Sequence, residues 1–354
     1  TTFSGLLDLT GAFDFTGGAL TLEGTGTNTL GGAMEVTNAG QFTLVESGGE
    51  ADLEVAGAFT QNGVGAVQLQ SDLSLTAAGA MQIASTLTLA GSDRVTLSTQ
   101  GGSGDDITLG TDATTDLLGS GQAIALDAGT AGDIAVLGNG GSSSSPLGAI
   151  EIVAAADAVF SESVDAASFT QTASTGRTDF EGLLGLTGNL DYTATAATGL
   201  LEFSATGDHS VGGTFEATLF EGAAAGSGFT LQNGANLLVT GAFTQDIAAS
   251  NTAGSVSLGG NITTTDSALS IVTPVTLNGD VTLGSGSGTA GDVTISATVN
   301  GGHGLTVDAG TGAVELGGVV GGSTDLASLT VSGTTISLQD VTTTGAQSYT
   351  GAIT

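Results

Sequence analysis

The chain contains no cysteine, no tryptophan and only two prolines. Without cysteine it can form neither disulfides nor thiolate metal sites, and it has no cysteine nucleophile. Its 61 glycines do not recur at every third position, and two prolines are too few for proline-rich disorder, so collagen-like and proline-rich classes are excluded. Aromatic residues make up 4% of the sequence. A core built mainly from Ala, Val, Leu and Ile must therefore be thin.

Basic residues are almost absent. Arg94 and Arg177 are the only two, against 35 acidic residues, which gives a net charge of −33. This charge repels nucleic acids and anionic membrane surfaces, so we expect neither as a direct partner. The acids are scattered along the chain, which favours a solvated acidic surface over a dedicated cation store.

Membrane-spanning and signal segments are also lacking. No apolar run reaches the ~20 residues that span a bilayer, and no basic region precedes an apolar stretch. An acidic, lysine-free chain rich in Thr, Ser and Gly is more typical of an exported bacterial surface protein than of a cytosolic enzyme. We therefore expect an extracellular or cell-surface location without direct membrane insertion. We expect the export signal and the anchor to lie outside these 354 residues.

The sequence is internally duplicated. FSGLLDLTG at residues 3–11 returns as FEGLLGLTG at residues 180–188, with seven of nine positions identical and an offset of half the chain. A repeat of this kind predicts two tandem units, residues 1–176 and 177–354, continuous with each other and part of a longer array. Further pairs follow in the same order: GGAMEVT (31–37) with GGTFEAT (212–218), GAFTQ (57–61) with GAFTQ (241–245), and LDAGT (126–130) with VDAGT (307–311).

Short runs of alternating apolar and polar residues fill both units, for example LSLT at residues 73–76 and VTLN at residues 275–278. A period of two indicates β-strands, and no stretch shows the apolar stripe of a helix. Each run offers only two apolar side chains to one face, which is too little for a sandwich. Stacked coils of a solenoid would join them into one continuous interior. We predict an all-β solenoid, an elongated rod with coils of roughly 20 residues and two or three strands each.

The C-terminal residues 291–354 contain three characteristic runs: GLTVDAGTGAVELGGVVGG (304–322), ASLTVSGTTISL (327–338) and TTTGAQSYTGAIT (342–354). This segment resembles the repetitive shafts of filamentous-haemagglutinin-like bacterial surface proteins, and unit 1 resembles a diverged version of it. The resemblance implies a right-handed parallel β-helix that is exported and acts as an adhesin or surface fibre. It is a likeness of the shaft alone and transfers no functional residue. The secretion module and the receptor-binding regions of such proteins have no counterpart here.

A calcium site is the one metal site that the sequence suggests. GGSGDD at residues 101–106 matches the start of the Gly-Gly-x-Gly-x-Asp calcium repeat, with Asp105 and Asp106 as candidate ligands. The repeat needs a large apolar residue where Thr108 stands, with Leu109 one place late, and the motif occurs once. The alternative is a glycine-rich corner that ends in an Asx-type turn. No other cofactor is expected.

Catalytic groups are sparse. The two histidines, His209 and His303, have no metal-cluster or nucleophile–base spacing, so we expect surface or turn positions for both. Asp105 with Asp106, or Glu151 with Asp157, could serve as a glycosidase pair. Such enzymes usually combine acids with basic and aromatic residues. The chain has two Tyr and two Arg, so we predict that it is not an enzyme.

Threonine and phenylalanine also need an interpretation. The Thr86-Leu87-Thr88 pattern is compatible with an ice-binding face, but single Thr residues that alternate with apolar residues are ordinary strand patterning. We expect most phenylalanines to fill the core or stack as ladders. They are Phe13, Phe15, Phe42, Phe59, Phe160, Phe169, Phe180, Phe203, Phe215, Phe220, Phe229 and Phe243.

These observations favour a non-catalytic structural or adhesive shaft of a bacterial surface fibre. A calcium-dependent surface-layer or matrix protein and, less readily, a carbohydrate-active β-helix enzyme are the alternatives. For a shaft, the expected partners are neighbouring copies of the repeat, end-to-end or lateral, and a receptor or glycan on a host or cell surface.

Overall fold

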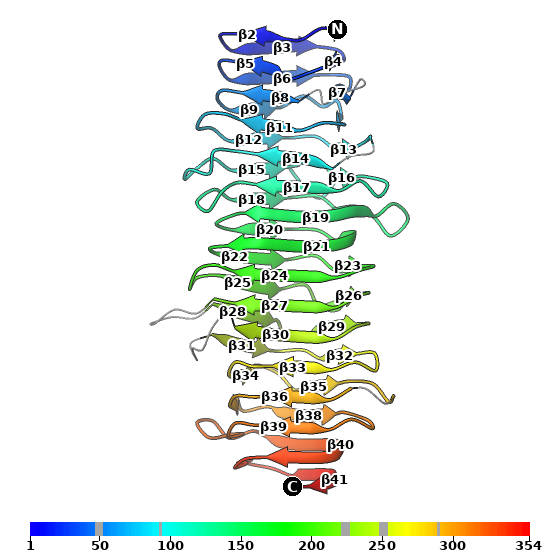
Figure 1. Ribbon diagram of the computed structural model, residues 1–354, viewed down its shortest axis with the longest axis vertical. Helices are drawn as coiled ribbons and strands as arrows, with labels where there is room; N and C mark the ends of the chain where they lie inside the picture. Colours follow the sequence, from blue (N-terminus) through cyan, green and yellow to red (C-terminus); the bar gives the residue numbers. More distant parts are fainter. Residues whose placement is uncertain (47–51, 92–93, 221–226, 248–253, 289–290) are drawn as a thin grey trace. The chain divides into compact units, whose positions relative to one another are not determined.

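The computed structural model describes residues 1–46, 52–91, 94–220, 227–247, 254–288 and 291–354. Its contacts divide the chain into two units, Thr1–Gly176 and Arg177–Thr354. The described residues contain β-strands and no α-helix (Figure 1). The strand pairings within each unit are parallel, and a strand typically pairs with the third strand after it, so each coil of the chain contributes one strand to each of three columns. The prediction of a parallel β-solenoid is therefore confirmed.

In unit 1 the strands stack in three columns, coil upon coil (Figure 1). The first column contains β1 (Thr2–Phe3), β4 (Leu20–Gly24), β7 (Phe42–Glu46), β10 (Val67–Leu69), β13 (Leu87–Leu89) and β16 (Leu117–Leu118). The second contains β2 (Asp8–Leu9), β5 (Asn28–Leu30), β8 (Leu53–Val55), β11 (Leu73–Leu75), β14 (Val95–Ser98), β17 (Ile124–Asp127), β19 (Leu147–Ala154) and β21 (Val164–Ser174). The third contains β3 (Phe13–Gly17), β6 (Met34–Asn38), β9 (Phe59–Gln61), β12 (Met81–Ile83), β15 (Ile107–Leu109), β18 (Ile134–Val136) and β20 (Ala158–Phe160).

Unit 2 repeats this arrangement. One column contains β22 (Arg177–Phe180), β25 (Leu200–Phe203), β28 (Gly228–Leu231), β31 (Ser255–Leu258), β34 (Val275–Leu277) and β37 (Val299–Asn300). A second contains β23 (Leu184–Leu186), β26 (Gly207–Val211), β29 (Ala235–Val239), β32 (Ile262–Thr264), β35 (Val281–Gly284) and β38 (Gly304–Asp308). The third contains β24 (Leu190–Ala194), β27 (Phe215–Leu219), β30 (Phe243–Ile247), β33 (Leu269–Ile271), β36 (Val293–Ile295) and β39 (Val314–Leu316). The last strands are β40 (Ser328–Leu338) and β41 (Gln347–Ile353).

The alternating runs form the strands because each places two apolar residues inside the coil. In β11, Leu73 and Leu75 are buried and Ser74 between them faces outward. Parallel register then lines up one interior position from coil to coil, as in the fully buried pair Phe42 and Val67. Each such side chain contributes about 1.5–3 kcal/mol relative to exposure. The interior is thus a stack of thin apolar layers.

The coils are longer and less regular than expected. Register partners are separated by between 17 residues, from Ile336 to Ile353, and 30 residues, from Leu87 to Leu117. The variation lies in the connections between strands, which the alternating pattern does not constrain. The run ASLTVSGTTISL forms one long strand, β40, which pairs with β38 through its first half and with β39 through its second.

Phenylalanines form much of the core, as predicted. Phe215 and Phe243 stack at 4.6 Å with an interplanar angle of 14°, and Phe180 stacks on Phe203 at 5.4 Å. Three of the twelve, Phe13, Phe15 and Phe220, are only half-buried, and Phe13 makes a T-shaped contact with Phe3 at 6.1 Å. The buried ones are Phe42, Phe59, Phe160, Phe169, Phe180, Phe203, Phe215, Phe229 and Phe243.

Candidate functional site

The suggested calcium motif forms a hydrogen-bonded corner. Asp105 is buried, and its two carboxylate oxygens accept hydrogen bonds from the backbone N–H groups of Gly79 at 2.7 Å and Gly102 at 2.8 Å. Asp106 accepts one from the N–H of Asp133 in the next coil at 2.9 Å. The backbone of this glycine-rich corner closes a turn from the carbonyl oxygen of Gly102 to the N–H of Asp105 at 3.0 Å, and the Asp105 side chain bonds back to Gly102 instead of to the residue two further on, as an Asx-type turn would require. Within the described residues, no three His, Asp or Glu side chains form a group that could hold a metal ion.

The two histidines occupy different environments. His303 lies at the surface, as expected, with 43% of its side chain exposed and Nδ1 4.0 Å from Asp280. The same expectation is wrong for His209, which is fully buried. His209 Nδ1 accepts a hydrogen bond from the N–H of Leu184 at 3.2 Å, and Nε2 lies 3.1 Å from the carbonyl oxygen of Ala205. Its ring also packs edge-on against Phe203 at 5.0 Å.

His209 has a structural counterpart in unit 1. Aligning GGAMEVT with GGTFEAT places His209 at the position of Asn28. Asn28 is also buried, and its Oδ1 accepts a hydrogen bond from the N–H of Leu7 at 3.0 Å. Leu7 and Leu184 are themselves equivalent in the repeated FxGLLxLTG motif. The two units therefore make the same bond between coils, one with an amide and one with an imidazole.

A second buried polar position also recurs. Gln61 and Gln245, the last residues of the two GAFTQ motifs, are both fully buried. Gln61 Oε1 accepts hydrogen bonds from Ala84 N at 3.1 Å, Ser85 N at 3.2 Å and Ser85 Oγ at 3.1 Å. Such a side chain joins one coil to the next through three bonds to a single oxygen.

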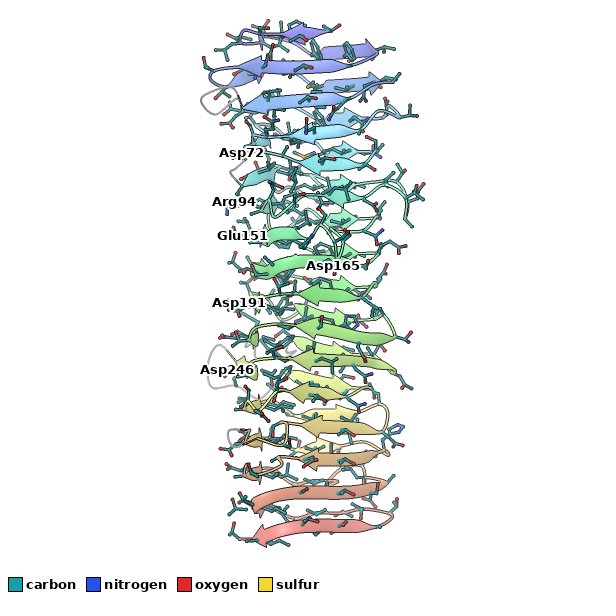
Figure 2. All side chains as sticks on the ribbon, turned by 90° about the vertical axis from the view of Figure 1, so that its right-hand side faces the viewer. Asp72, Arg94, Glu151, Asp165, Asp191 and Asp246 are labelled. Carbon is teal, nitrogen blue, oxygen red and sulfur yellow. The ribbon has the colours of Figure 1, made fainter. Side chains whose placement is uncertain are left out.

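Both arginines bind carboxylates in other coils. Arg94 pairs with Glu151 (Figure 2). The strand β17 lies in register between β14 and the Glu151 strand β19, so the pair bridges an intervening coil. The pair is partly exposed, with 50% of the Arg94 side chain and 31% of the Glu151 side chain accessible. Since Glu151 lies on β19 and Asp157 lies just before β20 in another column, the structure does not bring this suggested glycosidase pair onto one face.

Arg177 is the centre of a more buried charged cluster in unit 2. Its guanidinium bonds to Asp179, and its Nε donates to Glu202 Oε2 at 2.6 Å. Asp179 and Glu202 are register partners on β22 and β25. Ser204 Oγ donates to Asp179 at 2.7 Å, and Gln232 donates to Glu202. The carboxylates are thus held by partners from the same and neighbouring coils.

Burial controls the ionisation of this cluster. Asp179 is fully buried, and this raises its pKa even though the Ser204 hydroxyl and the Arg177 charge act in the opposite direction. Burial lowers the pKa of Arg177, but Glu202 and Asp179 raise it overall, so the guanidinium stays charged. The arrangement joins the coils of β22, β25 and β28 through charged and polar side chains.

Shallow grooves occur on the outer surface of each unit. One groove of about 310 Å³ in unit 2 is lined by residues that include Leu238, Thr263 and Thr265. Leu238 is 42% exposed and replaces Glu54, its equivalent in unit 1. Two grooves in unit 1, of about 410 and 320 Å³, are lined in part by Thr88 and by Asn62. None of these three grooves is lined by a charged residue or a histidine.

The rank of outward residues that contains Thr88 is not made of threonine alone. Thr88 of β13 stands in register with Gln68 of β10 on one side and with Leu118 of β16 on the other. An ice-matching face would need threonine at each of these positions. The column therefore agrees with ordinary strand patterning.

Four features escaped the sequence prediction: the bonds of Asn28, of His209 and of the two buried glutamines, and the Arg177 cluster. The first three were detectable in principle, because alignment of the duplicated motifs pairs Asn28 with His209 and Gln61 with Gln245.

Comparisons with protein-family models, with curated proteins and with solved structures gave no match. Along the described parts of the chain, no helix has the length and apolar character needed to cross a membrane.

Proposed function

We propose that this chain is a structural or adhesive shaft segment of a secreted bacterial surface fibre of the filamentous-haemagglutinin type. The observation that carries the proposal is that two homologous units both fold into stacked parallel coils. In each unit, backbone hydrogen bonds join a strand to its equivalent in the next coil. An array of this kind grows by adding coils, because each coil contacts only its neighbours.

The polar interior residues support a mechanical role. Gln61, Gln245, Asn28 and His209 all bond backbone groups of another coil, and the two arginines bond carboxylates in other coils. These side chains resist separation of adjacent coils. The partners proposed for such a segment are neighbouring copies of the repeat, end-to-end or lateral, and a surface receptor or glycan where the fibre is adhesive.

The net charge of −33 agrees with a surface fibre. Like charge keeps parallel fibres apart and prevents nonspecific binding to nucleic acid. The charge-free grooves, with Leu238 in one of them, offer surfaces at which this repulsion is locally weakest. A neighbouring fibre or a glycan that binds in one of these grooves would contact no charged side chain of the groove lining.

Deletion of one unit at a time in the producing bacterium tests the proposal. Removal of residues 1–176 and removal of residues 177–354 serve as matched controls for each other, because each deletes one repeat. A shaft predicts that either deletion shortens the surface fibres in electron micrographs by the same amount and leaves export intact. Fibres of unchanged length would overturn the shaft role. Loss of cell adhesion with only one of the deletions would locate a binding site in that unit.

A further inference from the structure

We propose that His209 is an acid-sensitive latch between β23 and β26 which unit 2 has and unit 1 lacks. The latch is the hydrogen bond from the N–H of Leu184 to Nδ1 of His209. A ring nitrogen can accept this bond only while it carries no proton. Since Nε2 faces the carbonyl oxygen of Ala205, the geometry assigns the single ring proton to Nε2.

Acid must break this arrangement. A second proton would go to Nδ1, which would then direct an N–H group at the N–H of Leu184. The resulting cation would be fully buried, in T-shaped contact with Phe203. Both effects disfavour the charged ring, because a lost acceptor leaves a buried donor unpaired and burial penalises charge.

The charged surroundings provide limited compensation. Asp208 precedes His209 on β26, and its carboxylate accepts a hydrogen bond from Asn236 on β29 at 3.0 Å. Glu202 on β25 and Asp179 on β22 both bind Arg177, and Glu181 lies between β22 and β23. The strands that pair with β26, namely β23 and β29, carry no titratable side chain.

The direction of the pH effect follows from burial. Burial lowers the pKa of His209 below 6.5, although the hydrogen bond to Ala205 and the charge of Asp208 act in the opposite direction. When pH falls through 6.5, His209 therefore becomes protonated in the unfolded segment while it stays neutral in the folded segment. Because the unfolded state binds more protons, the local stability of unit 2 falls as pH drops below that value. In unit 1 the Asn28 amide makes the same bond and does not titrate. The acid response depends on the fold alone and not on the role proposed for the chain.

Hydrogen exchange on the full chain tests the latch. Exchange would be measured by mass spectrometry at pH 7.5 and pH 5.0, with correction for the intrinsic rates, on peptides that cover Leu184 and Leu7. We expect the protection of Leu184 to fall several-fold at pH 5.0 and that of Leu7 to stay unchanged. Equal changes at the two sites, or no change at Leu184, would overturn the proposal.

Three variants separate His209 from the nearby carboxylates. His209→Asn should abolish the acid response of unit 2, and Asn28→His should create one at Leu7. His303→Asn, which alters the surface histidine, should leave the response as in the wild type. If His209→Asn loses protection in acid as the wild type does, the carboxylates are responsible and the latch is refuted. A proton NMR titration of His209 gives an independent check, because titration at or above pH 6.5 would also refute it.

Discussion

Gln61 and Gln245 accept equivalent hydrogen bonds through Oε1 in the two units. Gln245 Oε1 accepts from Val272 N at 3.2 Å, Thr273 N at 3.1 Å and Thr273 Oγ1 at 2.8 Å, which matches the bonds of Gln61 to Ala84 and Ser85. The repeated GAFTQ motif therefore preserves a buried bond between coils as well as a strand. This relationship gives a direct test of how the coils are held together.

Replacing Gln245 with Leu should destabilise unit 2 by about 2–4 kcal/mol, because the backbone N–H and the hydroxyl of Thr273 lose their buried acceptor, while the N–H of Val272 keeps the backbone carbonyl oxygen of Gln245. Gln61→Leu should cost unit 1 a similar amount. Gln82→Leu is the matched control, since Gln82 is exposed in β12, and it should change stability by less than about 0.5 kcal/mol. Urea unfolding followed by circular dichroism measures all three. Equal effects of the buried and exposed changes would contradict the proposed role of these bonds.

Arg177→Gln should destabilise unit 2 by about 3 kcal/mol, because it leaves two neighbouring buried carboxylates, Asp179 and Glu202, without their counter-charge. Adding Asp179→Asn should restore part of the loss. Arg94→Gln is the control, since its ion pair is partly exposed and contains no fully buried carboxylate, and it should cost at most about 1 kcal/mol.

The same Arg177→Gln variant should respond to pH in a defined direction. Burial already raises the pKa of Asp179, and removal of the guanidinium raises it further. The folded form then binds a proton at a higher pH than the unfolded form does. Stability of the variant relative to wild type should therefore rise as pH falls through that raised pKa. A stability difference that stays constant from pH 7 to pH 4 would show that repulsion between the two carboxylates is not the cause.

Glycine is required where successive coils approach closely. A Cβ on Gly212 would lie 2.5 Å from the carbonyl oxygen of Thr187, and one on its equivalent Gly31 would lie 2.6 Å from that of Thr10. Alanine at either position should cost about 1–3 kcal/mol through overpacking. Gly11→Ala should be harmless, because a Cβ there would meet nothing within 4 Å. Thermal melts of the three variants distinguish close packing from a general effect of losing glycine.

The calcium alternative can be tested on the chain directly. If Asp105 holds the corner through Gly79 and Gly102, Asp105→Ala should destabilise unit 1 by about 1–3 kcal/mol, and EDTA should leave the melting temperature unchanged. The partly exposed Asp106 should be less sensitive to the same change. A melting temperature that falls with EDTA and recovers with Ca²⁺ would instead support a calcium-dependent surface-layer or matrix protein.

The sequence was sufficient to predict the strands, since runs such as LSLT at residues 73–76 set both the period of two and the buried face of β11. It also predicted most of the phenylalanine core. The length of each coil could not be predicted in the same way. The 30 residues from Leu87 to its register partner Leu117 include connections between strands that show no periodic pattern. The Arg177 cluster and the burial of His209 depend on register between coils. Composition and local spacing do not reveal that register, although alignment of the two copies would have paired His209 with Asn28.

Parallel stacking in register is the central claim, and the absence of native cysteine makes a disulfide test clean. Thr306 and Thr330 are register partners on β38 and β40, so their Cα atoms should lie about 4.8 Å apart, within disulfide range. Thr282 is the partner of Thr306 on the other side, one coil further from Thr330. Under mild oxidation, Thr306→Cys with Thr330→Cys should form an intramolecular disulfide, and Thr282→Cys with Thr330→Cys should retain free thiols. Free thiols in the first pair, or equal cross-linking in both, would contradict the stacked coil.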